Sequence, residues 1–255
     1  MIKLIATDLD GTLLRKDDSI SQRTIDVLRK CQKAGIKIAF ATARSEGASR
    51  SFVDIIKPDV VIANSGGKII CNGEIIYKSK LDSDTVEGII GQIRSTINEE
   101  SVITTETDEG YFSNVMADDS YLAGFRHPIY CDYKDFHHSA YKITASIADK
   151  DKAEKIATKF KDCELICFRG EDWKCFLHRD SRKSKAVEIL AEYLNISMSE
   201  VAAFGDDYSD IEMLVSCGIG IAVENSIDAV KEIADCVTGS CDDDGVAEFI
   251  EKNIL

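Results

Sequence analysis

Five short apolar segments constrain the fold of this 255-residue chain more than any other feature. They cover residues 2–7, 36–41, 59–63, 201–204 and 219–223, and segments with helical spacing separate neighbouring members. Strands made almost wholly of apolar residues are typical of a parallel sheet that is covered on both faces. The sequence therefore predicts an α/β fold with a parallel-sheet core that is discontinuous along the chain.

The middle of the chain has a different pattern. A helix is expected from Leu81 to about Glu99 and another from about Lys150 to Lys161, because apolar residues recur at helical spacing. Segment 141–147 alternates between apolar and polar residues, as a half-buried strand does. We expect residues 81–180 to form a separate α+β domain inserted between residues 1–80 and 181–255.

Composition and charge exclude several classes of function. The formal net charge of −14 disfavours nucleic-acid binding and docking on an anionic membrane surface, since both need basic surface. The cysteine count of 9 is odd, which favours reduced thiols over a disulfide framework. No apolar run is long enough to cross a membrane. We expect a soluble cytoplasmic protein.

Polar residues follow the ends of the predicted parallel strands. In open parallel sheets the carboxyl ends of the strands share one edge, and ligands bind there at the point where strand order reverses. The sequence predicts that one edge of the sheet carries Asp8, Asp10, Thr42, Arg44, Asn64, Asp206 and Asp207.

Acidic residues dominate this predicted edge. Asp8 and Asp10 are two apart on an extended segment, so their side chains project to the same side and favour a bound cation between them. If Asp206 begins a helix, Asp210 lies one turn later on the same face. We interpret Asp206 as a metal ligand and Asp207 and Asp210 as its support, although acids at a helix start can also be simple caps.

Helix geometry selects a positively charged partner. At 100° per residue, Lys183 falls in the same arc as the apolar residues Val187, Leu190 and Leu194, whereas Lys185 lies opposite. A lysine on the inward side of a helix suggests a charge that is buried or faces a cleft. The alternative is a lysine that extends past the edge of the core into solvent.

These side chains suit the hydrolysis of a phosphate monoester. Asp8 would attack phosphorus to form an aspartyl-phosphate, and Asp10 would protonate the leaving oxygen and later activate water. Thr42 and Lys183 would bind the phosphoryl oxygens, and Arg44 and Asn64 would lie near the substrate. A divalent cation would neutralise the repulsion between the two anions.

The motifs resemble those of the haloacid dehalogenase-like superfamily, and most closely its Cof-type phosphatases. The resemblance rests on Asp8-Leu9-Asp10-Gly11-Thr12, on Thr42, on Lys183, and on the segment from Gly205 to Asp210. It implies a Rossmann-like catalytic core, a cap domain inserted after the third core strand, and Mg²⁺ as the cofactor. It also implies that the metal ligands are the Asp8 carboxylate, the Asp10 backbone carbonyl and Asp206.

The chain departs from the family pattern at a few positions and leaves some questions open. Ser209 stands where the family usually has Asn, and Ser65 where it usually has Gly. The same strand-end set also fits a phosphosugar mutase, and it fits a non-catalytic phospho-receiver or ligand-binding module. The candidates for substrate specificity are Arg126, His127, Lys142, Arg169 and Trp173. The sequence identifies neither the phosphorylated metabolite nor the oligomeric state.

Overall fold

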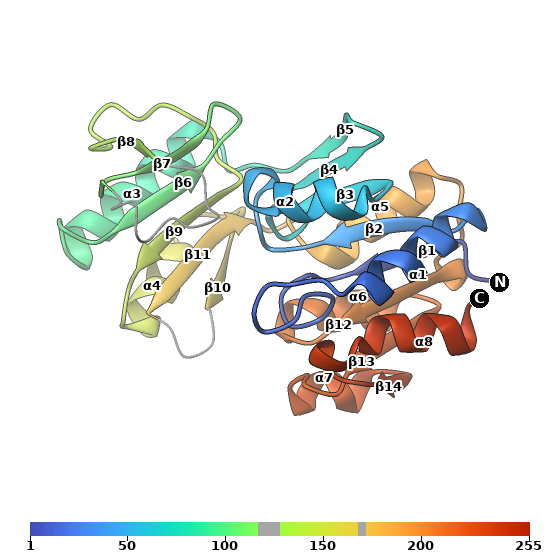
Figure 1. Cartoon of the computed structure of the whole chain (residues 1–255). Coiled ribbons are helices and arrows are strands. Elements are labelled where there is room, and N and C mark those ends of the chain that lie inside the picture. Colours follow the sequence, from blue (N-terminus) through green and yellow to red (C-terminus); the bar gives the residue numbers. More distant parts are fainter. Residues whose placement is uncertain (117–127, 168–171) are drawn as a thin grey trace. The chain divides into compact units, whose positions relative to one another are not determined.

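The chain divides into two compact units. A computed structural model describes residues 1–116, 128–167 and 172–255. The first unit, here the core unit, comprises Met1–Lys78 and Arg182–Leu255, and the second, the inserted unit, comprises Ser79–Ser181. Figure 1 shows the elements of both units along the chain.

The core unit is built on one sheet, with the described strands in the order β14-β13-β12-β1-β2-β3-β4-β5 (Figure 1). The strands from β14 to β3 run parallel, and β1 lies between β12 and β2. Strand order therefore reverses beside β1, which is where ligands bind in open α/β sheets. The strand bounds are β1 Leu4–Thr7, β2 Lys37–Ala41, β3 Val60–Ala63, β4 Lys68–Cys71, β5 Glu74–Lys78, β12 Val201–Gly205, β13 Ile219–Val223 and β14 Cys236–Thr238.

The hairpin of β4 and β5 was not anticipated from the sequence. It adds two antiparallel strands to the edge of the sheet beyond β3. Its turn is Asn72-Gly73, and both residues have positive φ, of 50° and 84°. This dipeptide is a strong hairpin signal because such turns match the twist of the strands.

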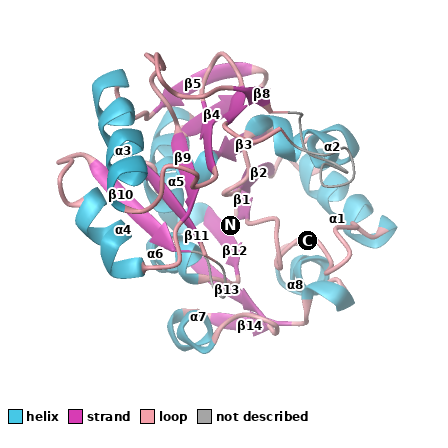
Figure 2. Cartoon of the chain, turned by 90° about the vertical axis from the view of Figure 1, so that its left-hand side faces the viewer, coloured by secondary structure: helices cyan, strands magenta, loops and turns pink. Residues whose placement is uncertain are grey.

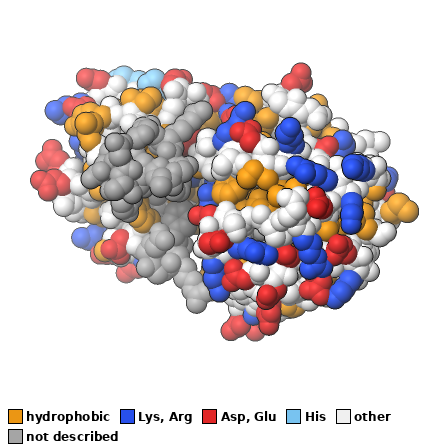
Figure 3. Space-filling model, in the orientation of Figure 1, with side chains coloured by type: hydrophobic (Ala, Val, Ile, Leu, Met, Phe, Trp, Pro, Cys, Tyr) orange, Lys and Arg blue, Asp and Glu red, His pale blue; other side chains and the backbone are white. Residues whose placement is uncertain are grey.

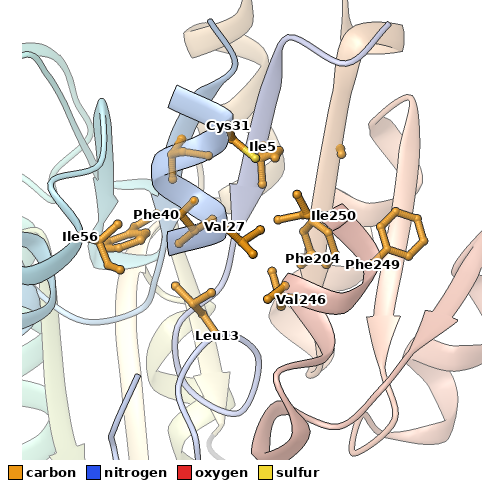
Figure 4. Packing of buried hydrophobic residues seen from close by; sticks show 14 of the residues in the cluster. Ile5, Leu13, Val27, Cys31, Phe40, Ile56, Phe204, Val246, Phe249 and Ile250 are labelled. Carbon is orange, nitrogen blue, oxygen red and sulfur yellow. The ribbon is translucent and has the colours of Figure 1, made fainter. Parts of the chain in front are cut away.

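Helices cover both faces of the core sheet. Helices α1, α2 and α8 pack on one face, and α5, α6 and α7 pack on the other. Figure 4 shows Val27 and Ile250 packed around Ile5 and Phe204 of the sheet. Burial on both faces explains why these strands are apolar along their whole length. The bounds are α1 Gln22–Lys33, α2 Glu46–Ile56, α5 Lys183–Tyr193, α6 Ile211–Ser216, α7 Asp228–Ile233 and α8 Gly245–Asn253, with 3₁₀ turns at Asn64–Gly66, Met198–Glu200, Tyr208–Asp210 and Cys241–Asp243.

The inserted unit has a sheet and a core of its own. Its described strands have the order β10-β11-β9-β6-β7-β8, and all neighbours are antiparallel except β7 and β8. Helices α3 and α4 pack on one face of this sheet (Figure 2). The bounds are α3 Ser83–Thr96, β6 Ile103–Glu106, β7 Tyr111–Ser113, β8 Ile129–Tyr130, β9 Lys142–Ser146, α4 Lys150–Ala157, β10 Cys163–Cys167 and β11 Trp173–His178.

Helix α4 is shorter than the sequence predicted. It ends at Ala157 rather than at Lys161, because Phe160 N–H donates to the Ala157 carbonyl and closes a tighter turn. The sequence also predicts a strand from Cys163 to Phe168 and a turn at Gly170, and both Phe168 and Gly170 lie outside the described residues.

The sequence predicts no membrane-spanning segment and no disulfide framework. None of the described helices is both long and apolar enough to cross a bilayer. All nine cysteines are free thiols.

On the face shown in Figure 3, lysine and arginine side chains of the core unit are interspersed with aspartate and glutamate. Charges of both signs therefore share this surface, despite the negative net charge of the chain.

The loop after β3 is held in an unusual backbone conformation. Asn64, Ser65 and Gly66 all have positive φ, of 53°, 58° and 100°. A Cβ atom on Gly66 would lie 2.3 Å from the carbonyl oxygen of Arg182, the residue that precedes α5. The missing side chain at Gly66 therefore lets this loop pack closely against the start of α5.

Replacement of Gly66 by Ala should destabilise the core unit more than the same change at Gly73. Both glycines have positive φ, which costs a non-glycine residue about 1–2 kcal/mol. A Cβ on Gly73 would meet nothing within 4 Å, whereas one on Gly66 would clash with backbone. Urea unfolding should show a larger loss of unfolding free energy for G66A than for G73A, by about 1–3 kcal/mol. Equal losses would contradict the close packing at Gly66.

Candidate active site

The candidate site lies at the carboxyl ends of β1 and β12. Asp8 directly follows β1, and its N–H donates to the Phe204 carbonyl at 3.0 Å. Asp206 directly follows β12, which pairs in parallel with β1. Lys183 is the first residue of α5, which covers one face of the same sheet. Three separate elements thus bring these side chains to one place.

A buried ammonium group is the centre of the site. Lys183 Nζ donates to Asp8 Oδ1 at 2.6 Å and to Asp210 Oδ1 at 2.7 Å. The side chains of Lys183, Asp8 and Asp210 are 2%, 7% and 1% exposed. Lys183 faces inward, as helix geometry predicted, and Lys185 is exposed. One lysine ammonium group therefore forms ion pairs with two carboxylates that are shielded from water.

Asp210 connects this ammonium group to the loop after β12. Its second oxygen, Oδ2, accepts the backbone N–H groups of Asp206 at 3.0 Å and Asp207 at 3.1 Å. The sequence allows a helix that begins at Asp206, and the structure does not place a helix start there. Asp206 and Asp207 form a loop, followed by a 3₁₀ turn, and α6 begins at Ile211. Asp210 therefore supports the loop through its carboxylate.

Asp206 has a partner that the sequence analysis did not identify. The hydroxyl of Thr12 donates to Asp206 Oδ1 at 2.6 Å. Gly11 packs beside the same carboxylate, because a Cβ there would lie 2.7 Å from Asp206 Oδ2. The residues after Asp10 thus fix the position of Asp206.

Burial shifts the proton affinities of the three central groups. It raises the pKa of Asp8 well above its usual range, and the Lys183 charge only partly opposes this. Burial also raises the pKa of Asp206 to about 6, an effect that the hydrogen bond from Thr12 moderates. Burial alone would lower the pKa of Lys183, but the charges of Asp210 and Asp8 raise it above its ordinary value. Lys183 is therefore held as an ammonium ion.

The carboxylates fit a hard divalent cation. Asp8, Asp206 and Asp210 offer oxygens that all lie within 4.8 Å of one another. In the described part of the chain, Asp8 Oδ2 and Asp206 Oδ2 accept no hydrogen bond, whereas both Asp210 oxygens are occupied. Oxygen ligands of this kind suit Mg²⁺, and a cation would offset the cost of burying these charges. Asp8 and Asp206 are accordingly the side chains best placed to bind it.

Asp10 and Arg44 form a second charged group. Arg44 Nε donates to both carboxylate oxygens of Asp10, at 3.0 and 2.9 Å. A terminal nitrogen of Arg44 donates to Asp18 Oδ1 at 3.0 Å, and the guanidinium group lies 4.9 Å from the centre of the Phe52 ring. Arg44 is thus fixed by two acids and an aromatic ring, and it holds the carboxylate of Asp10.

Thr42 and Asn64 lie in the loops around Arg44. The Arg44 N–H donates to Thr42 Oγ1 at 3.0 Å, and the Asn64 N–H donates to the Arg44 carbonyl at 2.8 Å. Asn64 is buried, and its Oδ1 accepts no hydrogen bond from the described residues. These contacts bring together Thr42, Arg44 and Asn64, which the sequence predicts at the ends of neighbouring parallel strands.

The specificity candidates fall in the inserted unit. Lys142 lies in β9 and Trp173 in β11, and both are half-buried. Arg126, His127 and Arg169 lie outside the described residues. A role in substrate recognition remains a prediction for all five.

Comparisons with known proteins identify the family of this chain. A model of the haloacid dehalogenase-like hydrolase family matches residues 5–250. The 5-amino-6-(5-phospho-D-ribitylamino)uracil phosphatase YitU of Bacillus subtilis is 27% identical over 98% of this chain and 96% of its own. The HMP-PP phosphatase of Escherichia coli is 24% identical over 98% of this chain and 95% of its own. Among solved structures, a haloalkanoate superfamily phosphatase from Bacteroides thetaiotaomicron superposes with a TM-score of 0.85 at 26% identity, over 99% of this chain and 95% of that one.

Replacement of Lys183 by Met should destabilise the protein strongly, and more so at alkaline pH. Removal of one partner from a buried ion cluster costs about 3–5 kcal/mol. Without the ammonium group, the pKa of Asp8 rises further, because burial then acts unopposed. When the pKa of a carboxyl group is higher in the folded state than in the unfolded state, the free energy of unfolding falls as the pH rises. Unfolding free energies at about pH 5 and pH 8 should show the larger loss at the higher pH.

Lys185 provides the matched control for that measurement. It lies on the same helix and is exposed, so K185M should change the unfolding free energy by less than about 0.5 kcal/mol. A K183M protein as stable as K185M at both pH values would show that the buried cluster does not stabilise the fold.

Proposed function

This chain belongs to the haloacid dehalogenase-like hydrolases, and from that premise we propose that it hydrolyses a small phosphorylated metabolite with Mg²⁺, through an aspartyl-phosphate on Asp8. The enzyme is a phosphoric monoester hydrolase of the Cof type, as its relatives are phosphatases. The observation that carries the proposal is the contact of Lys183 with Asp8 and Asp210, beside Asp206.

The contact of Lys183 with Asp8 supports nucleophilic attack by Asp8. An ammonium group 2.6 Å from Asp8 Oδ1 favours the ionised carboxylate and is in position to bind a phosphoryl oxygen. Asp8 Oδ1 interacts with Lys183, and in the described part of the chain Asp8 Oδ2 accepts no hydrogen bond. A buried nucleophile is poorly hydrated, so little water must be displaced before the reaction.

The reaction then has two balanced steps. In the first, an Asp8 oxygen forms a bond to phosphorus, the ester P–O bond breaks, and the leaving oxygen takes the proton of the Asp10 carboxyl group. In the second, a water oxygen forms a bond to phosphorus and gives a proton to Asp10. The bond between phosphorus and Asp8 breaks, and its electron pair returns to the Asp8 carboxylate.

The residues around Asp8 bind and orient the substrate. Asp8, Asp206 and the Asp10 backbone carbonyl would hold the metal, with Asp207 and Asp210 in support. When bound, Mg²⁺ neutralises the repulsion between the Asp8 carboxylate and the phosphate dianion. Thr42 and Lys183 donate to the phosphoryl oxygens. Arg44 must release Asp10 before Asp10 donates its proton, because both Asp10 oxygens now accept from Arg44.

The substrate belongs to the class of small phosphate monoesters, with sugar phosphates as the first choice. The inserted unit is the proposed cap domain, and its residues select among such esters. A small metabolite, not a nucleic acid, suits the net charge of −14. The proposed location is the cytoplasm, where free thiols such as the nine found here persist.

Phosphate release should depend on Asp8 and on Asp10 to different degrees. The wild-type protein should release phosphate from p-nitrophenyl phosphate and from at least one of a panel of hexose, pentose and glycerol phosphates, when Mg²⁺ is present. D8N should fall to the background rate because it lacks the nucleophile. The rate of phosphate release by D10N should fall by about 10²–10⁴-fold, which is the usual contribution of a general acid or base.

An exposed acid controls for the change of charge. D26N on α1 should retain wild-type activity, because Asp26 lies on the exposed side of its helix. Phosphate release by D8N at the wild-type rate would exclude the proposed mechanism. Isomerisation of a sugar phosphate without net phosphate release would instead identify a phosphosugar mutase.

Stabilisation by Mg²⁺ should grow with pH. Asp206 has a pKa of about 6 and must lose its proton to bind a cation, so protons compete with the metal at acidic pH. The rise in Tm caused by Mg²⁺ should be small at about pH 5 and should level off by about pH 7.5. Thermal denaturation of wild type and D206N measures this rise without a substrate. A pH-independent rise, or an equal rise in D206N, would contradict metal binding by Asp206.

A further inference from the structure

The side chain of Asn225 links the loop after Asp10 to the C-terminal part of the chain. Asn225 lies two residues after β13, and its Nδ2 donates to the Gly11 carbonyl at 2.6 Å. Its Oδ1 accepts the Cys241 N–H at 2.9 Å and the Ser240 hydroxyl at 3.3 Å. A flipped amide would place two acceptors against each other at Gly11, so the neighbours fix its orientation.

The same two segments meet at a second place. The segment Ser240–Gly245, here the C-terminal loop, also contacts the residues that follow Thr12. Arg15 forms an ion pair with Asp244 at 2.8 Å, and the Lys16 N–H donates to Asp242 Oδ1 at 3.1 Å. The loop that carries Asp10 is therefore tied to the C-terminal loop at Gly11 and again at Arg15 and Lys16.

Gly11 is held from two sides. Asn225 binds its carbonyl oxygen, and the Asp206 carboxylate packs against its Cα, where a Cβ would lie 2.7 Å from Oδ2. Gly11 has a φ of 78°, which few other residues adopt. The peptide next to Asp10 thus has a fixed position relative to the candidate metal ligand Asp206.

Asn225 contributes little to the hydrophobic core. It is exposed, and its hydrogen bonds connect polar loops rather than packed apolar side chains. A hydrogen bond in such a place contributes about 0.5–1.5 kcal/mol to stability. A neutral amide also adds no charge beside Asp8, Asp10 and Asp206.

We propose that Asn225 is a positioning residue for Asp10, acting through the Gly11 carbonyl, and that the C-terminal loop holds Asn225 in place. This inference rests on the proposed function, in which Asp10 protonates the leaving oxygen. Proton transfer requires the donor within hydrogen-bond reach of its target, and a shift of about 1 Å can cost about 10²-fold in rate. Asn225 maintains that reach by fixing the backbone directly after Asp10.

The substitution Asn225→Asp tests the proposal with little change in shape. It keeps the acceptor for the Cys241 N–H and replaces the donor to Gly11 with an oxygen. The test compares kcat/KM for p-nitrophenyl phosphate with kcat/KM for the alkyl phosphate of the panel that wild type hydrolyses fastest. This parameter covers the steps up to formation of the aspartyl-phosphate, which include departure of the leaving group.

The expected result depends on the leaving group. Nitrophenolate leaves without a proton, so the kcat/KM of N225D for the aryl ester should fall by less than about 3-fold. An alkoxide needs the proton of Asp10, so the kcat/KM of N225D for the alkyl ester should fall by about 10-fold or more. N225A, which lacks both the donor and the acceptor, should show the same dependence on the leaving group. Tm should stay within a few degrees of wild type for both variants.

The control variant is K16M. It removes the exposed ion pair between Lys16 and Asp242 while leaving all three side-chain hydrogen bonds of Asn225 in place, so its kcat/KM should stay within about 2-fold for both esters. Equal losses of N225D with the two esters, or no loss with the alkyl ester, would overturn the positioning role. A wild-type protein that releases no phosphate from either ester would instead refute the proposed function, and the inference with it.

Discussion

The buried ion cluster of Lys183, Asp8 and Asp210 is the interaction on which the site depends. An isolated charge of this kind would be very costly in the interior of the protein, so each member is tolerated only because of the others. Lys183 contacts both carboxylates, and Asp210 in turn accepts two backbone N–H groups of the loop after β12. The cluster therefore fixes the ends of β1 and β12 and the start of α5 with respect to one another. Charges that are already oriented need no reorganisation during the reaction, which is the main source of electrostatic catalysis.

The loops around the cluster are placed by close backbone contacts. Gly66 packs against the Arg182 carbonyl, directly before Lys183, and Gly11 packs against the Asp206 carboxylate. Each contact requires a residue without a side chain at that point. The positions of the lysine and of the third acid thus depend on two glycines in loops that lie far from them in the sequence.

Local patterns predicted much of this arrangement. The apolar segments indicated the strands, the ends of those strands indicated the edge that carries the site, and a rotation of 100° per residue identified Lys183 as the inward-facing lysine. The hairpin of β4 and β5 was missed although its Asn72-Gly73 turn is a recognised signal. Thr12 and Asn225 were missed for a different reason. Their partners, Asp206 and Gly11, lie 194 and 214 residues away in sequence, and no local pattern encodes such contacts.

The central claim is that Asp8, paired with Lys183, becomes covalently phosphorylated. Rapid acid quenching during the first turnover with p-nitrophenyl phosphate, followed by peptide mass spectrometry, tests it directly. The account predicts a phosphoryl group on the peptide that contains Asp8, labile to hydroxylamine and absent in D8N. Release of phosphate in the first turnover with no phosphoryl group ever found on Asp8 would contradict the account.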